Sequence, residues 1–506
     1  MSNNATFVRY RIVIISILMA FGLYLTRVSL GEIVKSDSFL NDKRLIDHPA
    51  TRFELELMDS GTASKQLLVF VCRLTERSEA DAETLKLSYP QLLRDNLTRD
   101  AALRYLEQLE AVGGTGRIRI SKQQIGTVLG AFFFAYALLQ VPAGWLGDRF
   151  GARRALSMYI LSWSALTAIT GLMVSLPGLM FSRLGYGVTQ AGAYPASSAI
   201  VRRWFPLSRR GRASSFISFG GRLGGTLAPL LTAGLIAYLG GWRETLKAYG
   251  VFGILVAFGY WMIVRDRPAL HPQCNAEEQD LIGLPEENPS FSLRELLPVL
   301  NACATNRSLW LNSLEQFCVN VGWVFLITWL ATYLKETKGV PADKGAWMVS
   351  IILAMGLVGQ LIGGWATDFS VRKLGLRIGR VLPVCVACSI AGVAYLSCLA
   401  LDNVWAIVVC CAIVSLMTDV ANPSTWAFMQ DVGGSSTATV FGWANMWGNF
   451  GAAFSASMVP KLINWGSESG TGQQLVFIAC ASAFFIAGAA ALGMDATKPL
   501  RTVELH

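Results

Sequence analysis

The stretch Gly144-Trp-Leu-Gly-Asp-Arg-Phe-Gly-Ala-Arg-Arg-Ala-Leu156 decides the fold, because it joins two long apolar segments through a tight basic loop. A degraded copy, Gly363-Gly-Trp-Ala-Thr-Asp-Phe-Ser-Val-Arg-Lys-Leu-Gly375, occurs in the second half of the chain. In each copy an apolar helix is expected to end in small residues, followed by Asp and then by several Arg or Lys. The duplication indicates two similar membrane-embedded halves, which is the architecture of a transporter that rocks two bundles about a central site.

The composition favours a membrane protein. The 506 residues are 53% hydrophobic and 15% charged, whereas soluble domains need more surface charge. The net charge of +9 comes from Arg and Lys in short loops between apolar spans, so we expect no nucleic-acid partner. The ten cysteines show no metal-ligand spacing, and we expect no disulfide framework, metal or cofactor. Residues 12–30 are long enough to span a membrane, so no cleavable signal peptide is expected.

A span of roughly 20 apolar residues predicts an all-α membrane protein with twelve transmembrane helices in two pseudo-symmetric six-helix bundles. The first six are expected near residues 12–30, 121–142, 157–173, 177–200, 213–239 and 246–264. The second six are expected near residues 308–334, 344–366, 381–399, 404–428, 437–463 and 473–494. The corresponding domains are an N-terminal bundle over 1–264, a cytoplasmic linker over 265–306, a C-terminal bundle over 307–494 and a cytoplasmic tail over 495–506.

The basic residues around these spans fall on one side. By the positive-inside rule, both termini should therefore be cytoplasmic, in a multi-pass protein of the cell (inner) membrane. We expect the protein to act as a monomer in the lipid bilayer.

Residues 31–118 form an extracytoplasmic insertion. Its apolar patch from Leu67 to Cys72 is too short to cross a bilayer. The segment from Ala80 to Val112 has leucines at helical spacing. The insertion is expected to be either a small helical cap over the outer mouth or a passive, partly disordered loop.

The repeated loop predicts a contact between the halves. Asp148 ends the second expected helix, near the expected start of the eleventh at Thr437. A helix N-terminus carries about half a positive charge, which attracts a carboxylate. We therefore expect Asp148, with Arg149 beside it, to hold the cytoplasmic side shut. By pseudo-symmetry, Asp368 should meet the start of the fifth helix near Ala213; the alternative is that these charges only fix the topology.

Three arginines lie within expected spans: Arg27, Arg183 and Arg222. A charge near the bilayer centre costs roughly 2.5–3.5 kcal/mol, so such residues usually face a water-filled cavity. Guanidinium is always charged and binds a carboxylate in bidentate fashion, which predicts an organic anion as cargo. The alternatives are snorkelling to the outer interface for Arg27, an ion-pair network for Arg183 and a structural role among glycines for Arg222.

Several motifs allow a more specific comparison. They are Tyr24-Leu-Thr-Arg27, the run from Arg183 to Gln190 with Ala191-Gly-Ala-Tyr-Pro195, Trp204-Phe-Pro206, Trp242-Arg243, Trp329-Leu-Ala-Thr-Tyr-Leu334, Asp431-Val-Gly-Gly434 and Asn445-Met-Trp-Gly-Asn449. The loop motif resembles the major facilitator superfamily signature. Nearly the whole chain, apart from the insertion and tail, resembles its anion:cation symporters, which include bacterial sugar-acid permeases and the sialin and vesicular glutamate transporter relatives of animals. This resemblance implies that Arg27 and Arg183 recognise the anion or couple its movement.

The chain departs from that family at two positions. Its bacterial sugar-acid symporters generally carry Asp immediately before the first-helix arginine and Glu seven residues after the fourth-helix arginine. This chain has Thr26 and Gln190 there, and neither side chain can titrate in that range. Glu315 and Asp419 lie within expected spans and are candidate substitutes; alternatively, either is a structural partner of an arginine.

The membrane potential opposes the uptake of an anion by a carrier that is not coupled to a cation. Bringing one negative charge into a cell costs about 2.3 kcal/mol per 100 mV of inside-negative potential, so uptake against a gradient needs a cotransported cation, H+ or Na+. If Glu315 and Asp419 are not proton sites, an anion exchanger, a facilitator or a sodium-coupled carrier is expected.

Other polar and aromatic residues are expected to line the cavity and bind a polyhydroxy acid. They are Tyr24, Tyr136, Gln190, Gln360, Trp426, Asn445 and Asn449. The three histidines, His48, His271 and His506, are scattered outside the spans, so we expect no enzyme activity. A transporter-like sensor without flux is a further alternative.

Overall fold

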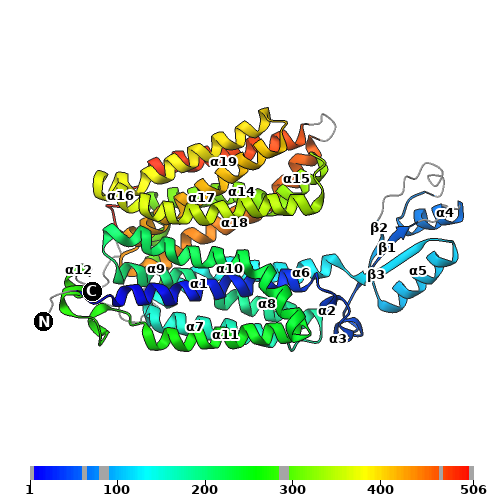
Figure 1. Cartoon of the computed structure of the whole chain (residues 1–506), viewed down its shortest axis with the longest axis horizontal. Coiled ribbons are helices and arrows are strands. Elements are labelled where there is room, and N and C mark those ends of the chain that lie inside the picture. The colour runs from blue at the N-terminus through cyan, green and yellow to red at the C-terminus, as the bar shows by residue number, and fades with distance from the viewer. Residues whose placement is uncertain (1–4, 60–64, 79–89, 284–295, 467–470, 501–506) are drawn as a thin grey trace.

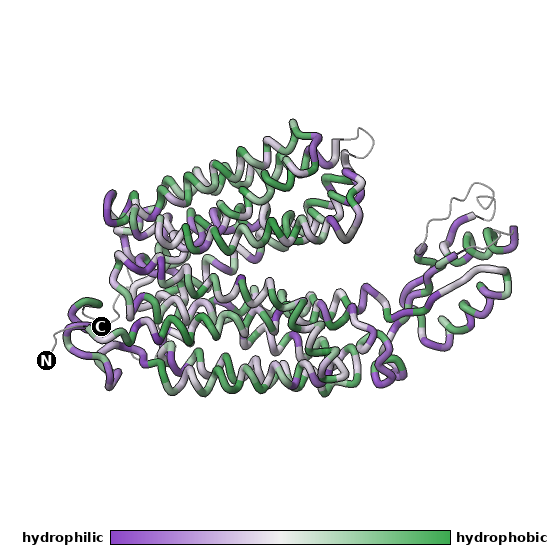
Figure 2. The backbone as a smooth tube through the Cα atoms, viewed as in Figure 1, coloured by the Kyte–Doolittle hydropathy of each residue, from purple (hydrophilic) through white to green (hydrophobic). Residues whose placement is uncertain are grey.

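The computed structural model describes residues 5–59, 65–78, 90–283, 296–466 and 471–500. Two helical bundles and a small α/β domain make up this part of the chain (Figure 1). Hydrophobic residues run along the helices of both bundles, whereas hydrophilic residues gather at their ends and in the α/β domain (Figure 2). This distribution is the one expected for helices that cross a bilayer.

Eight helical stretches of the described residues are long and apolar enough to cross a membrane. Two of them, Lys344–Ala400 and Val404–Trp465, each contain two helices. With α7 and the pair α8 and α9, which are less apolar, each half of the described chain has six spans. The predicted twelve-helix, two-bundle membrane fold is thereby confirmed.

The helices follow the repeat. The N-terminal bundle contains α1 (Val8–Ile33), α6 (Lys122–Phe150), α7 (Ala152–Thr170), α8 (Leu176–Gln190) with α9 (Ala193–Trp204), η2 (Leu207–Arg209), α10 (Arg210–Leu239) and α11 (Trp242–Ile263). The segment between the bundles contains η3 (Pro268–Leu270), α12 (Ala276–Ile282) and α13 (Leu296–Thr305). The C-terminal bundle contains α14 (Arg307–Val324), η5 (Phe325–Trp329), α15 (Leu330–Glu336), α16 (Ala342–Ser397), η6 (Cys398–Ala400), α17 (Val404–Gly433), η7 (Gly434–Ser436), α18 (Thr437–Trp465) and α19 (Gly472–Leu492).

Two spans differ from the continuous helices expected. The fourth breaks between α8 and α9, just before Pro195 in the first turn of α9. A proline ring clashes with the carbonyl four residues earlier, so a continuous helix is disfavoured there. The seventh span contains η5, a π-helical turn, directly after α14.

In α16, Gly375 with φ 77° separates two transmembrane helices.

The insertion between α1 and α6 is an α/β domain. Its antiparallel sheet has the order β2-β1-β3, with β1 (Phe53–Asp59), β2 (Gln91–Leu97) and β3 (Thr115–Ile120). The helices α4 (Lys65–Leu74) and α5 (Arg99–Ala111) pack against the sheet. The helix predicted from the leucine spacing over 80–112 is wrong at β2, which is a strand. The same leucine spacing fits a strand once β2 pairs with β1. Residues 80–89 of that segment lie outside the described residues.

The two faces of β1 differ in chemistry. Leu55 and Leu57 are fully buried in the core that the sheet shares with α4 and α5. Glu54 and Glu56 alternate with these leucines along β1, so they belong to the opposite face. Basic residues pair with both carboxylates: Arg119 bonds to Glu54, and Lys122 Nζ lies 2.9 Å from Glu56 Oε1.

The insertion is tied to the N-terminal bundle below it. Short helices α2 (Asp37–Leu40) and α3 (Lys43–Ile46) lead from α1 into the sheet. Asp42 Oδ2 accepts hydrogen bonds from Trp242 Nε1 at 3.0 Å and Arg243 Nε at 2.8 Å, at the start of α11. Burial raises the pKa of Asp42, but Arg243, Trp242 and the Arg44 backbone N–H outweigh it and lower that pKa below 3.8.

The bundles meet through two helix pairs that the repeat relates. α6 packs on α18, and α10 packs on α16. Small residues permit both contacts: a Cβ on Gly144 would lie 2.3 Å from the carbonyl oxygen of Ala438, and a Cβ on Gly364 would lie 2.4 Å from the Ser215 Cβ. Close backbone approach at small residues is a common way for membrane helices to pack.

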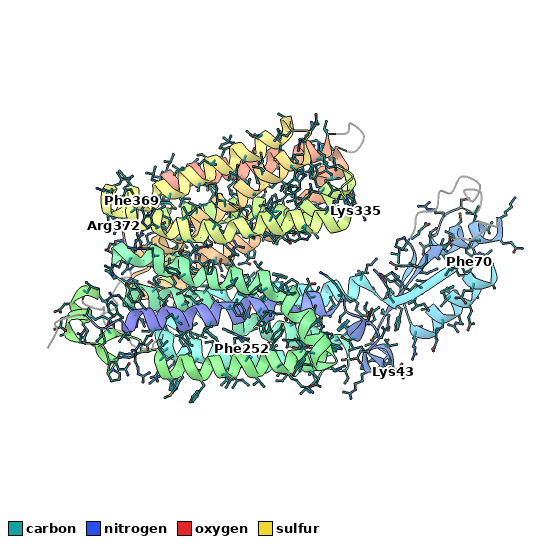
Figure 3. All side chains as sticks on the ribbon, viewed as in Figure 1. Lys43, Phe70, Phe252, Lys335, Phe369 and Arg372 are labelled. Atoms are coloured by element: carbon teal, nitrogen blue, oxygen red, sulfur yellow. The ribbon has the colours of Figure 1, made fainter. Side chains whose placement is uncertain are left out.

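The bundles meet at the end of the molecule that carries both termini, and their ribbons separate toward the end that carries the α/β domain (Figure 1). Arg372, in the second copy of the repeated loop, lies at the end with the termini, and Lys335 lies at the other (Figure 3). This basic loop and the two termini therefore share one end.

Substituting Gly144→Ala tests the contact between α6 and α18. The new methyl group would collide with the Ala438 backbone, so we expect a loss of about 1–3 kcal/mol of stability. Gly130→Ala on the same helix is the control, since its Cβ would meet open space and alanine favours a helix by up to about 1 kcal/mol. Thermal unfolding in detergent measures both; equal effects of the two substitutions would contradict the close contact.

Substituting Asp42→Ala tests the anchor of the insertion. Because the pKa of Asp42 is lowered, its stabilisation is present above about pH 4 and is lost as the pH falls through the folded-state value. We expect a loss of about 1.5–3 kcal/mol at neutral pH, and this difference from wild type should shrink in acid. Thermal unfolding and limited proteolysis of the insertion measure it. The control is Asp47→Ala, whose ion pair with Arg99 is half exposed and should contribute under about 1 kcal/mol.

Candidate functional site

A cavity lies between the bundles. It encloses about 930 Å³ of space outside protein atoms, part of it open to solvent. Its wall comes from α1, α6, α9 and α10 of the N-terminal bundle and from α14, α17 and α18 of the C-terminal bundle. The lining residues are Tyr24, Arg27, Tyr136, Tyr194, Ser218, Arg222, Glu315, Gln316, Val319, Asn320, Trp323, Thr418, Asp419, Ala421, Asn422, Thr425, Trp426, Asn445 and Asn449.

Arg27 brings a cation to this cavity. Its guanidinium carbon lies 4.6 Å from the ring centroid of Tyr24 and 4.5 Å from that of Tyr136. Its Nε donates to Gln190 Oε1 at 3.1 Å, whereas its Nη2 is buried and has no hydrogen-bond partner. No salt bridge to Arg27 forms among the described residues, so its charge is not neutralised by a protein carboxylate. This arrangement differs from snorkelling to the outer interface.

The two departures from the symporter pattern lie beside Arg27. Thr26 Oγ1 bonds to the Tyr186 hydroxyl at 2.6 Å and to the carbonyl of Gly22 in its own helix at 2.7 Å. Gln190 is fully buried and donates through Nε2 to the Tyr186 hydroxyl at 2.6 Å. The positions that carry carboxylates in the symporters thus form a neutral hydrogen-bond network, and Gln190 contacts Arg27 without lining the cavity.

Arg183 lies behind the cavity wall. Its guanidinium carbon is 4.7 Å from the ring centroid of Tyr186 and 5.1 Å from that of Phe132, and Arg27 lies the same 5.1 Å from Phe132. Arg183 Nε is buried without a partner. It does not line the cavity, and no ion pair of Arg183 occurs within the described ranges. Arg183 therefore adds a second positive charge close to Arg27, behind the residues that line the cavity.

Arg222 and Asp419 form a salt bridge across the bundles. Arg222 Nη2 and Nε lie 2.7 and 3.2 Å from Asp419 Oδ1, and the guanidinium packs 4.1 Å from the Trp323 ring centroid. Gln360 Nε2 donates to the same oxygen at 2.7 Å. The structure thus pairs a predicted anion-binding arginine with a predicted coupling carboxylate, and Gln360 supports that pair from outside the cavity.

Glu315 lines the cavity without a basic partner in the part of the chain that the structure describes. Thr425 Oγ1 donates to Glu315 Oε1 at 3.3 Å, and Glu315 Oε2 is buried without a hydrogen bond. Its side chain is 2% exposed. Within the described residues, no group of three or more His, Cys, Asp or Glu side chains could hold a metal ion.

The other predicted lining residues Tyr136, Trp426, Asn445 and Asn449 do face the cavity. Tyr194 was not predicted as a lining residue; its ring lies 6.1 Å from Tyr24 and 4.9 Å from Trp426 and so bridges the bundles. The amides of Gln316, Asn320 and Asn422 and the Trp323 ring also line the cavity without having been predicted. The sequence did hold a signal for three of them: Gln316, Asn320 and Trp323 are four and then three residues apart in one apolar span, so they lie on one face of the helix.

The contact predicted from the repeated loop joins the two bundles. Asp148 accepts hydrogen bonds from the backbone N–H of Ala438 at 2.9 Å and of Thr439 at 2.8 Å, and from Thr439 Oγ1 at 2.7 Å. These donors belong to the first turn of α18, where a carboxylate is most stabilising. Arg149 follows Asp148 at the end of α6 with a half-buried side chain.

Asp368 makes the pseudo-symmetric contact. It accepts from the Gly211 N–H at 2.9 Å and the Arg212 N–H at 3.2 Å, in the first turn of α10, and from Arg212 Nε at 3.0 Å. Each carboxylate therefore caps a helix of the opposite bundle, and topology alone does not require such a cap.

A third contact at this end was not predicted. Asp431 binds Arg210 Nη1 of the opposite bundle at 2.6 Å and Arg380 Nε of its own bundle at 2.7 Å. Arg380 is fully buried and also donates to the Leu207 carbonyl at 2.9 Å. The sequence shows these residues only as loop charges, because their pairing depends on how the two bundles dock.

Comparison with known proteins identifies the family that the chain matches and several of its relatives. Residues 78–456 match the family model described as Major Facilitator Superfamily. The chain is 28% identical over 389 residues to a probable sulfoacetate transporter of Cupriavidus necator, which covers 76% of this chain and 87% of the relative. It is also 28% identical over 371 residues to a probable galactarate/D-glucarate transporter of Bacillus subtilis, which covers 70% of this chain and 80% of the relative.

Solved structures share the fold. The crystal structure of the human organic anion transporter aligns with a TM-score of 0.59 at 15% identity, covering 96% of this chain and 99% of that chain. The Escherichia coli fucose:proton symporter aligns with a TM-score of 0.56 at 14% identity, covering 73% of this chain and 90% of that chain. At these identities the likeness concerns the fold alone.

Substituting Asp148→Asn tests the closed end. The asparagine side chain has no charge, and only one of its two terminal atoms can accept a hydrogen bond. We expect the closed state to lose about 2 kcal/mol of stability, which would shift the population toward the state with separated ends roughly thirtyfold. Spin labels at Met158→Cys and Ile378→Cys, both exposed, measure that separation by pulsed electron resonance. Asp280→Asn, at an exposed position of α12, is the control. An unchanged distance distribution in Asp148→Asn would argue against the cap.

Proposed function

The chain belongs to the Major Facilitator Superfamily and is a multi-pass membrane transporter rather than an enzyme, and we propose that it carries an organic anion through the cavity between its bundles. The observation that carries this proposal is Arg27, a buried guanidinium at the cavity whose Nη2 has no partner and whose charge has no bonded carboxylate among the described residues. A buried charge without a counter-ion is expensive. A negatively charged cargo would supply that counter-ion.

The cargo we propose is a carboxylate or sulfonate with hydroxyl groups, such as a sugar acid. Relatives are described as probable transporters of sulfoacetate and of galactarate or D-glucarate, all of which are small acids. Amides of Asn320, Asn422, Asn445 and Asn449 line the cavity and can bond to hydroxyl or carboxylate oxygens. Tyrosine and tryptophan rings supply the apolar faces that a carbon chain can pack against.

Movement of the cargo would follow from rocking of the bundles. The caps at Asp148 and Asp368 would hold one end shut while the cavity faces the end that carries the insertion. Breaking both caps and closing the opposite end would expose the cavity to the side of the termini. We propose that this side faces the cytoplasm and that the membrane is the inner membrane, in keeping with the basic loops. One copy would suffice, because a single chain builds the whole cavity.

Uptake into proteoliposomes tests this function. Labelled D-glucarate, galactarate and sulfoacetate are compared with neutral D-galactose, and we expect uptake of at least one of the acids and none of the sugar. Arg27→Gln should weaken the acid's apparent affinity roughly tenfold to a hundredfold, since a charge-assisted hydrogen bond contributes about 1.5–3 kcal/mol. Arg104→Gln, at an exposed position of the insertion, should behave as wild type. Preference for D-galactose, or unchanged acid uptake in Arg27→Gln, would reject the proposal.

A further inference from the structure

One face of α10 carries a row of hydrogen bonds to the C-terminal bundle. The participating positions are three or four residues apart and therefore lie on one side of the helix. From the closed end toward the cavity, the bonds join Gly211 to Asp368, Ser215 to the Gln360 carbonyl, Ser218 to Asn422, and Arg222 to Asp419. The last two pairs, Ser218 with Asn422 and Arg222 with Asp419, have both partners at the cavity, and the Arg222–Asp419 pair is the charged one.

The two oxygens of Asp419 have different surroundings. Oδ1 accepts all three bonds, two from Arg222 and one from Gln360. Oδ2 is buried and has no hydrogen-bond partner. It is close to Gly356, where a Cβ would lie only 2.3 Å from it. One oxygen is therefore saturated, and the other is free to hold a proton.

Arg222 is the exchangeable member of this pair. Its side chain is 24% exposed, whereas that of Asp419 is fully buried. A cargo carboxylate could offer Arg222 both of its oxygens in bidentate fashion, whereas Asp419 now offers it one oxygen. Once Arg222 turned to the cargo, Asp419 would retain only the Gln360 bond and would be a buried carboxylate without a counter-ion. A carboxylate in that position takes up a proton.

We propose that Asp419 is the proton-binding site of this carrier, and that an anionic cargo loads it by drawing Arg222 away from it. This inference rests on the proposed function. The proton comes from the water in the cavity and binds to Oδ2, so one negative charge on the cargo and one positive charge enter together. The step is electroneutral for a monoanion and removes the electrical opposition to uptake. It replaces the coupling that Thr26 and Gln190 cannot provide.

The charged and polar groups around Asp419 favour this assignment over Glu315. Glu315 has no basic partner among the described residues, so cargo binding would not change its counter-ion. Arg222 of α10 and Gln360 of α16 bond to the carboxylate. The other α-helices packed on α17 contribute polar groups to the same cavity, namely Tyr194 of α9, Glu315 of α14, and Asn445 and Asn449 of α18.

The test compares two rates in proteoliposomes that contain the full chain. One is exchange of labelled D-glucarate or sulfoacetate for the same unlabelled acid, which needs no driving ion; the other is accumulation driven by an inward proton gradient. With the membrane potential held at zero, one proton per acid predicts that wild type accumulates the acid roughly tenfold for a gradient of about one pH unit. In Asp419→Asn the ratio of accumulation to exchange should fall at least about tenfold, because the amide cannot titrate. A general loss of activity cancels in this ratio.

Asp402→Asn, an exposed carboxylate that pairs distantly with Lys338, should keep the wild-type ratio. If Asp419→Asn fails to fold, Gly356→Ala presses on Oδ2 without removing a charge and should lower the same ratio. Exchange without proton-driven accumulation in wild type, or proton-driven accumulation that persists in Asp419→Asn, would overturn the inference. Absence of exchange with every acid would instead reject the proposed function.

Discussion

Arg27 keeps a permanent positive charge within the span of α1, and no carboxylate of the described chain is bonded to it. The neighbouring groups are aromatic rings and the amide of Gln190, which satisfy part of the guanidinium without neutralising it. A charge in such a place usually faces a water-filled cavity. The polar cavity, its position between the bundles and the proposed cargo all depend on this requirement.

A second device recurs through the molecule, in which a carboxylate from one segment caps the first turn of a helix in another. Asp148 caps α18 and Asp368 caps α10, across the bundles. Glu278 of α12 accepts from the N–H groups of Val8 and Arg9 and so fixes the segment between the bundles to α1. These contacts give a charged acceptor to first-turn N–H groups that have no partner within their own helix. The contacts across the bundles can break and re-form without unfolding either helix.

Local physical signals explain what could be predicted from the sequence. Span positions follow from hydropathy, the Asp148 cap follows from the order of helix end, acid and base, and the place of Arg27 follows from the penalty for a charge in lipid. The pairing of Arg222 with Asp419 could not be predicted, because nothing local specifies how two bundles dock. The sheet was missed because the leucines of β2 suit a helix as well as a strand until β1 is beside them. The break before Pro195 had a local signal, which the apolar run obscured.

The sheet of the insertion is joined firmly to α6. The Ser121 N–H donates to the Arg52 carbonyl at 2.9 Å, and Lys122 at the start of α6 forms salt bridges with Glu54 and Glu56 of β1. With the anchor at Asp42, these bonds leave little freedom for the sheet to tilt independently of the helices beneath it. Any rotation of the N-terminal bundle is consequently magnified at the far tip of this appendage. A nanobody or fluorophore fixed there would report each turnover from outside the membrane, without touching the path of the solute.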